Sequence, residues 1–388
     1  MAISDTVTNS GPQHRPDDRL TAAEFFAGIG LVRLALMHQG WRVDWANDID
    51  ADKAEMYHAN FGSSDFVLGD VHQISASSVP DCSLYTASFP CNDLSVAGAM
   101  DGLHGKESSA FWGLVRILKE KGGRRPPLVM LENVLGFLMC DQGRDFERAL
   151  LALCDLGYTV DALIINASSF VPQSRPRLFV IAKRYDGGEP VNVAAQSAVR
   201  PAPLAQFINL TPHIRWDIRP MPMPPTGNHA LSDIVEDLPE NDLHWWNEER
   251  SQYFMEQLSA RHEVAAKDMI AGGNVSYATA FRRVRHGRSM AELRTDGLAG
   301  CLRTPRGGSG RQILFKAGKG RYQVRLLTAR ECARLQGAPD DFKIPVPLNQ
   351  ALFGFGDAVC VPVVEWITKY YLRPLLNARA PRPAEAAA

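Results

Sequence analysis

Long apolar runs and paired cysteines are both missing from this 388-residue chain. No stretch of eighteen apolar residues occurs, and the first twenty residues are polar, without the apolar centre of a signal peptide. The seven cysteines form no CxxC pair and no cluster with histidine. We therefore expect no membrane span, no disulfide framework and no metal site, and a cytoplasmic protein with reduced thiols.

Short apolar runs alternate with amphipathic stretches up to about residue 185. The strand-like runs are Thr21–Phe26, Arg42–Ala46, Ser83–Ser88, Leu128–Leu131, Val160–Asn166 and Leu178–Ala182. Helical spacing marks Ile29–Gln39, Phe111–Lys121 and Phe146–Leu156. This order predicts an α/β fold with a doubly wound, mostly parallel sheet.

A proline-rich stretch at 185–230 breaks that pattern, and regular helix returns only near residue 326. We expect a catalytic domain from residues 21–185 and 326–376, and a second, smaller, irregular domain from 186–325. Residues 1–20 and 377–388 are expected to be a disordered lead-in and tail.

The net charge of −1 favours no class of partner, but the charge is unevenly spread. Residues 231–263 hold nine acidic and two basic side chains, whereas residues 281–325 hold twelve Lys or Arg and two acidic ones. A basic block with interleaved glycines suits contact with phosphates. A solvated basic loop explains the block equally well, so both interpretations stay open.

EFFAGIGL at 24–31 places Gly28 and Gly30 at the first strand-to-helix turn. Such a turn lets a ligand approach backbone N–H groups, although glycines also open helices for packing reasons. Asp48 and Asp50 follow the second strand, and Asp70 follows a third apolar run. Acids at strand ends can bind ribose hydroxyls, which indicates a nucleotide or other adenosyl cofactor.

Three further features stand at strand ends. Cys91 follows Phe89-Pro90 directly, Glu132 closes the apolar strand PPLVMLENV, and Arg175 and Arg177 precede another strand. A buried acid needs a partner or a task. The spacing of the two arginines in an extended chain predicts that they share a face and converge on one group.

These motifs, taken in order, resemble the cytosine-5 DNA methyltransferases of the bacterial and phage type. The resemblance covers F-A-G-x-G at 26–30, Pro90-Cys91, Glu-Asn-Val at 132–134, Q-x-R-x-R at 173–177, RLLTARECARLQGAPDDF at 325–342 and GDAVCVP at 356–362. Four positions depart from the family pattern: Leu31 and Ser88 replace glycine, Asn92 replaces glutamine and Asp357 replaces asparagine.

The resemblance implies that Cys91 attacks C6 of a flipped-out cytosine while S-adenosyl-L-methionine donates the methyl group. It implies that Glu132 acts at cytosine N3 and that Arg177, with Arg175, contacts the base carbonyl. The cofactor residues implied are Phe26, Ala27, Gly28, Ile29, Gly30, Asp48, Ile49, Asp70, Pro90, Asp357 and Ala358. The DNA contacts implied are Asn92, Ser95, Arg303, Thr304, Arg306 and Arg311.

The family also implies double-stranded DNA as partner, a restriction endonuclease acting separately, a monomer and a place near the nucleoid. Residues 186–325 fall where the family has its target-recognition domain, and this long insert favours DNA over the RNA (tRNA) substrates of a related branch. A catalytically silent DNA-binding regulator would have lost Cys91 or Glu132. A nicotinamide-dependent oxidoreductase would need glycine where Arg33 stands.

Overall fold

The computed structural model describes residues 20–90, 109–188, 195–227, 229–285, 287–304 and 310–377. A seven-stranded sheet has the order β3-β2-β1-β4-β5-β7-β6. Its strands are β1 (Thr21–Phe25), β2 (Arg42–Asp48), β3 (Phe66–Leu68), β4 (Leu84–Ala87), β5 (Leu128–Asn133), β6 (Tyr158–Asn166) and β7 (Pro176–Arg184). Strands β1 to β5 are parallel, and β7 runs antiparallel to both β5 and β6. The predicted mostly parallel sheet is confirmed.

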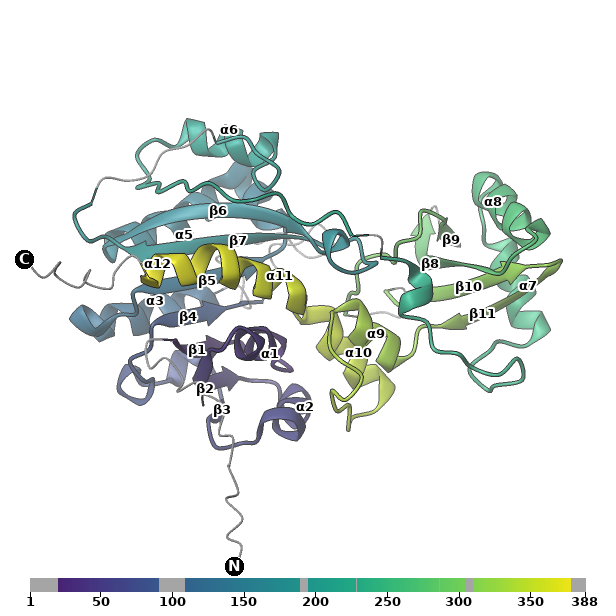
Figure 1. Ribbon diagram of the computed structural model, residues 1–388, viewed down its shortest axis with the longest axis horizontal. Helices are drawn as coiled ribbons and strands as arrows, with labels where there is room; N and C mark the ends of the chain where they lie inside the picture. Colours follow the sequence, from purple (N-terminus) through teal and green to yellow (C-terminus); the bar gives the residue numbers. More distant parts are fainter. Residues whose placement is uncertain are drawn as a thin grey trace, which may run out of the picture.

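Helices cover both faces of this sheet because its strands are apolar on both sides. In β5, Leu128 and Met130 face one core while Val129 and Leu131 face the other. The first core is closed by α1 (Leu31–His38) and α11 (Val361–Ile367), the second by α3 (Ala110–Lys121) and α5 (Arg144–Asp155). We call this body the large unit (Figure 1).

Shorter elements complete the large unit. They are α2 (Ala51–Phe61), α4 (Gly136–Met139), α6 (Ala202–Leu210), and the one-turn helices η1 (Val71–Gln73), η2 (Ala76–Ser78), η4 (Gly122–Arg124), η5 (Cys140–Gly143), η6 (Ala167–Ser169) and η7 (Leu231–Asp233).

The segment after residue 195 packs on the large sheet. Leu204 and Trp216 belong to its second core, and Arg200 donates two hydrogen bonds to the buried Asp161 (3.1 and 2.6 Å). Tyr371, near the C-terminal end, donates to the same carboxylate. This segment therefore belongs to the large unit, and the boundary between the two units lies later in the chain than the predicted residue 186.

The second body, the small unit, is a four-stranded antiparallel sheet in the order β11-β10-β8-β9. It consists of β8 (Ser276–Arg285), β9 (Arg288–Arg294), β10 (Ile313–Gly318), β11 (Arg321–Leu326), α7 (Glu248–Glu256) and α8 (Ala260–Ala271). The expected second, smaller domain is confirmed, although it contains a regular antiparallel sheet rather than an irregular fold. Its strands escape notice because small residues such as Ala278 and Ala280 form their buried face.

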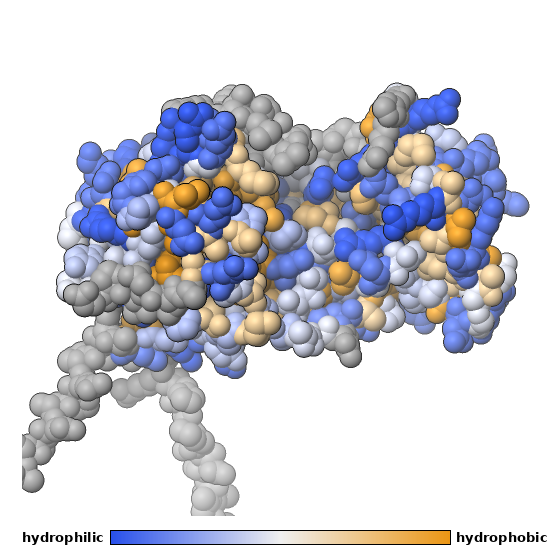
Figure 2. Space-filling model, turned by 90° about the horizontal axis from the view of Figure 1, so that it is seen from above, coloured by the Kyte–Doolittle hydropathy of each residue, from blue (hydrophilic) through white to orange (hydrophobic). Residues whose placement is uncertain are grey.

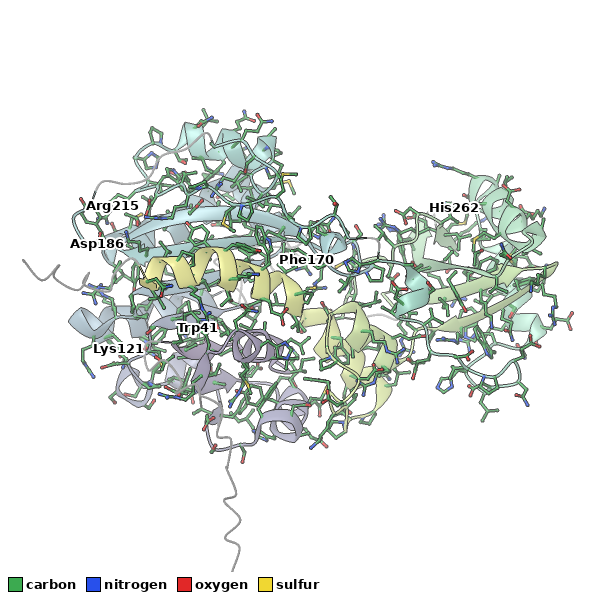
Figure 3. All side chains as sticks on the ribbon, viewed as in Figure 1. Trp41, Lys121, Phe170, Asp186, Arg215 and His262 are labelled. Atoms are coloured by element: carbon green, nitrogen blue, oxygen red, sulfur yellow. The ribbon has the colours of Figure 1, made fainter. Side chains whose placement is uncertain are left out.

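Side-chain and surface views show the same division. Trp41, Lys121 and Arg215 lie in the large unit, His262 lies on α8, and Phe170 lies toward the junction (Figure 3). Hydrophilic residues cover much of the outer end of the small unit (Figure 2).

Between the two units lie α9 (Ala329–Leu335) and α10 (Leu348–Asp357), and the chain continues through α11, the π-helical turn η8 (Thr368–Leu372) and α12 (Arg373–Asn377) (Figure 1). Among the described residues, Leu348–Asn377 is long and apolar enough to span a membrane, although no apolar run of that length was expected. Its most apolar window is 72% buried in the protein, as in a core helix.

A fully buried ion pair fixes α9 to the last strand of the small unit. Arg325 on β11 donates to both carboxylate oxygens of Glu331, and Glu331 also accepts the backbone N–H groups of Thr328 and Glu236 (both 2.9 Å). One guanidinium and two backbone N–H groups therefore compensate the negative charge of the Glu331 carboxylate.

Replacing Arg325 by methionine is expected to lower the free energy of unfolding by about 3–5 kcal/mol, because it leaves a buried, unpaired carboxylate. Urea denaturation measures this change. Arg321→Met on the same strand is the matched control, since its pair with Glu240 is about three-quarters exposed, and it should cost less than about 1 kcal/mol. Equal stability of the two variants would contradict the importance of the buried pair.

Candidate active site

An open cavity of about 460 Å³ lies at the carboxyl ends of the parallel strands. Ligands of doubly wound sheets bind at this edge. Twelve of the residues predicted from sequence line it: Phe26, Ala27, Gly28, Asp48, Ile49, Asp70, Pro90, Glu132, Arg175, Arg177, Asp357 and Ala358. The sheet thus brings together strand ends that are far apart in the sequence.

The turn after β1 is held by the end of β2. Asp48 accepts the backbone N–H of Gly28 at 2.7 Å and that of Asp50 at 2.9 Å. Burial raises the pKa of Asp48, although nearby Lys53 and these N–H groups oppose the shift. Phe26 and Gly28 both have positive φ (56°), so the turn is tight. Asp48 therefore fixes the conformation of the turn that forms this part of the cavity wall.

Two predicted cofactor residues do not line the cavity. Ile29 is 1% exposed and packs in the first core. Gly30 has φ 84°, and a Cβ there would lie 2.4 Å from the ring of Phe61. The structure therefore places Ile29 in the core and Gly30 against Phe61 of α2, and neither on the cavity wall.

Three cavity residues were missed in the sequence. Asn47 donates to the carbonyls of Val67 and Gly69 (both 2.8 Å) and so fixes β3 beside β2. Lys53 on α2 pairs with Asp357. Glu24 is 2% exposed, and neither of its carboxyl oxygens has a hydrogen-bond partner in the described part of the chain. The sequence did offer a signal for Glu24, a single acidic residue within the otherwise apolar strand TAAEF.

Burial raises the pKa of Glu24 from 4.5 to about 8, against the opposing charge of Arg33. Between these two values the folded protein keeps a proton that the unfolded chain loses. The free energy of unfolding therefore falls as pH rises from 4.5 to 8, with a contribution of up to about 1.4 kcal/mol per pH unit.

Glu24→Gln is expected to remove this part of the pH dependence and to stabilise the ligand-free protein most at pH 8. Urea denaturation at several pH values measures it. Glu55→Gln, at an exposed position of α2, should keep the slope of the wild type. The same slope in all three proteins would rule out proton retention by Glu24.

Glu132, at the end of β5, forms an ion pair with Arg177, whose Nε lies 3.1 Å from Oε1. The antiparallel register places Glu132 opposite Phe179, so Arg177 is its diagonal neighbour on β7. Burial raises the pKa of Glu132, and the charges of Arg177 and Arg175 and a hydrogen bond from Ser88 oppose this shift. The carboxyl thus holds a proton more readily than a free glutamate does.

Arg175 and Arg177 converge on the thiol of Cys301, whose Sγ accepts from Nη1 of Arg175 at 3.4 Å and from Nη2 of Arg177 at 3.7 Å. The guanidinium of Arg175 also donates to the carbonyls of Leu302 (2.8 Å), Gly356 (2.9 Å) and Ala358 (2.7 Å). Arg175 therefore ties the wall of the cavity to the segment that leads into the small unit. The contact of the two arginines with a base carbonyl stays a prediction.

The remaining predicted residues divide into two sets. Cys91, Asn92, Ser95 and Arg306 lie outside the described residues. Arg303, Thr304 and Arg311 are described but do not line the cavity. The backbone of Arg303 and Thr304 packs so closely on Gly356 that a Cβ there would lie 2.7 Å away, and Arg311 donates to Asn349.

Comparison with known proteins agrees with this architecture. The model of the family "C-5 cytosine-specific DNA methylase" matches residues 20–373. The Type II methyltransferase M.HhaI of Haemophilus parahaemolyticus is 29% identical over 375 residues, covering 93% of this chain and 97% of that protein. M.NgoBI of Neisseria gonorrhoeae is 29% identical over 347 residues, covering 88% of this chain and 90% of that one.

Solved methyltransferases share the fold. The S. pombe Dnmt2 methyltransferase superposes with a TM-score of 0.61 at 19% identity, covering 92% of this chain and 99% of its own. The Entamoeba histolytica methyltransferase EhMeth gives 0.61 at 14% identity, with the same coverage. The family match spans nearly all the described residues, so the predicted family is confirmed: this chain belongs to the C-5 cytosine-specific DNA methylases.

Proposed function

We propose that this enzyme methylates C5 of a specific cytosine in double-stranded DNA, with S-adenosyl-L-methionine as donor and Cys91 as nucleophile. One observation carries the proposal. A single cavity combines an acidic end, the Glu132–Arg177 pair and Pro90, and Cys91 is the next residue in the chain. The names of the relatives support a Type II modification role, with a separate restriction endonuclease as companion.

The acidic end of the cavity fits a cationic cofactor. Glu24 is a cavity residue, and its buried carboxyl oxygens have no hydrogen-bond partner in the described part of the chain. An unpaired buried acid is costly unless a ligand supplies the opposite charge. When bound, S-adenosylmethionine supplies an electrophilic methyl group on a positively charged sulfur. Its proposed binding residues are Phe26, Ala27, Gly28, Asp48, Ile49, Asp70, Pro90, Asp357 and Ala358.

The other end of the cavity fits a cytosine base. The thiolate of Cys91 adds to C6, forming the S–C6 bond and enriching C5 in electrons. Glu132 shares its proton with N3 and offsets the charge developing on the ring, while Arg177 fixes that carboxyl and faces the base carbonyl. When bound, the cofactor would supply the methyl group that C5 takes up. Water then takes the C5 proton, and the S–C6 bond breaks to release Cys91.

The small unit is proposed to hold the DNA, but part of its basic block, residues 281–325, contacts other groups of the protein. Arg294 pairs with Asp296, and the guanidinium of Arg282 lies over the ring of Trp246. The proposed DNA contacts therefore remain the residues near the junction: Arg303, Thr304, Arg306 and Arg311, with Asn92 and Ser95 from the segment after Cys91. We propose that the protein acts as a cytoplasmic monomer.

Bisulfite sequencing of plasmid DNA from cells that express the protein tests this function. We expect cytosines in one short sequence to be protected, and none in cells with empty vector. Soluble, folded protein that protects no cytosine would overturn DNA methylation as its activity and direct the same assay to cellular RNA.

A further inference from the structure

Lys53 joins two walls of the cavity. Its Nζ lies 2.6 Å from Asp357 Oδ2 at the end of α10 and 3.8 Å from Asp50 Oδ2 at the start of α2. Its side chain is 16% exposed, and both partners line the cavity. Burial alone would lower the pKa of Lys53, but the charges of Asp357 and Asp48 raise it above the ordinary value. The ammonium group is thus held between carboxylates of two separate turns, the one between β2 and α2 and the one at the end of α10.

These groups give the cavity an uneven charge. Its acidic end contains the carboxyl groups of Glu24, Asp48, Asp50, Asp70 and Asp357, and among the described residues Lys53 is the ammonium group that lies with them. Glu24 carries no full charge at neutral pH, because burial raises its pKa to about 8. The four aspartates still outnumber Lys53, so a ligand bound here meets an excess of negative charge that Lys53 reduces by one unit.

Asp357 lies between this acidic end and the base end. It pairs with Lys53, and its charge also raises the pKa of Glu132. A charge at Asp357 therefore acts on both the acidic end and the base end of the cavity. The family pattern has a neutral asparagine at this position, and Lys53 offsets the added charge.

We propose that Lys53 and Asp357 form a matched pair that positions the cofactor and sets how strongly the cavity prefers the cationic sulfonium cofactor over its neutral thioether product. This inference rests on the proposed cofactor. Lys53 lowers the preference by adding positive charge near the sulfur, and Asp357 raises it. Each acts on the charge of the ligand, so the pair distinguishes two molecules of nearly the same shape.

Calorimetric binding of S-adenosylmethionine and S-adenosylhomocysteine to the DNA-free protein tests the pair. The measured quantity is the ratio of the dissociation constant of the homocysteine compound to that of the methionine compound. A unit charge at roughly 8 Å, in a medium of effective dielectric constant about 40, changes such a ratio about fivefold. We expect Lys53→Met to raise the ratio about fivefold and Asp357→Asn to lower it about fivefold.

The double variant Lys53→Met/Asp357→Asn should return the ratio to within about twofold of the wild type, because the net charge is restored. Lys267→Met, which removes an exposed lysine paired with Glu263 on α8, should leave the ratio unchanged. If each single variant weakens the binding of both ligands by the same factor, the ratio of dissociation constants stays unchanged. The pair would then have only a structural role, and the inference would be overturned. Wild-type protein that binds neither ligand would overturn the proposed cofactor itself.

Discussion

Cys91→Ala is expected to lower the rate of cytosine methylation by at least about 10³-fold while the protein still binds DNA and folds normally. In the proposed mechanism the thiolate of Cys91 makes C5 nucleophilic, so its removal abolishes the covalent step. Radioactive methyl transfer to plasmid DNA measures the rate, and far-ultraviolet circular dichroism checks the fold.

Cys154→Ala is the matched control, because Cys154 is a buried thiol on α5 whose pKa burial raises. Its loss removes a cysteine without touching the cavity, so we expect near wild-type rates. Methylation by Cys91→Ala within tenfold of the wild type would mean that another group is the nucleophile.

Glu132→Gln is expected to lower kcat by about 10²–10⁴-fold, the usual effect of losing a group that transfers a proton. Glutamine keeps the shape of the side chain and can still accept from Arg177, but it cannot share a proton with cytosine N3. Single-turnover rates on DNA separate this step from binding and product release.

The pH dependence of the same rate gives a second test of Glu132. Burial raises its pKa, so the protonated form persists to higher pH than in a free glutamate. The rate should fall as pH rises through that raised value, and Glu132→Gln should lose this limb. The control Glu147→Gln, whose partner is His213, should keep both the rate and the profile. A Glu132→Gln rate above one-tenth of the wild type would contradict the role.

Much of the site could be predicted because its residues stand where strands end. Asp48 and Glu132 close apolar strands, and the carboxyl ends of parallel strands must meet at one edge. Asp357, at the end of α10, could be predicted only from the family resemblance. The fold class followed from the same alternation of strands and helices. The small unit could not be read as a sheet, since alanines give its strands little apolar contrast.

Other errors have equally local causes. The shared face of Arg175 and Arg177 could be predicted, but not that a protein thiol, Cys301, lies between them or that Arg175 also binds backbone carbonyls. Lys53 went unnoticed because the polar helix sequence ADKAE gives no signal of a role in the cavity. Only the packing of α2 beside α10 shows that it faces Asp357, because that contact joins residues 304 positions apart.

The most direct test of the account is the intact mass of the protein after incubation with S-adenosylmethionine and DNA in which 5-fluorocytosine replaces the target base. Fluorine cannot leave C5 as a proton does, so the S–C6 bond should persist. We predict a covalent protein–DNA adduct carrying one added methyl group, mapped to the peptide with Cys91 and absent from Cys91→Ala. Methylation of ordinary DNA without any such adduct, or an adduct on another residue, would contradict covalent catalysis by Cys91.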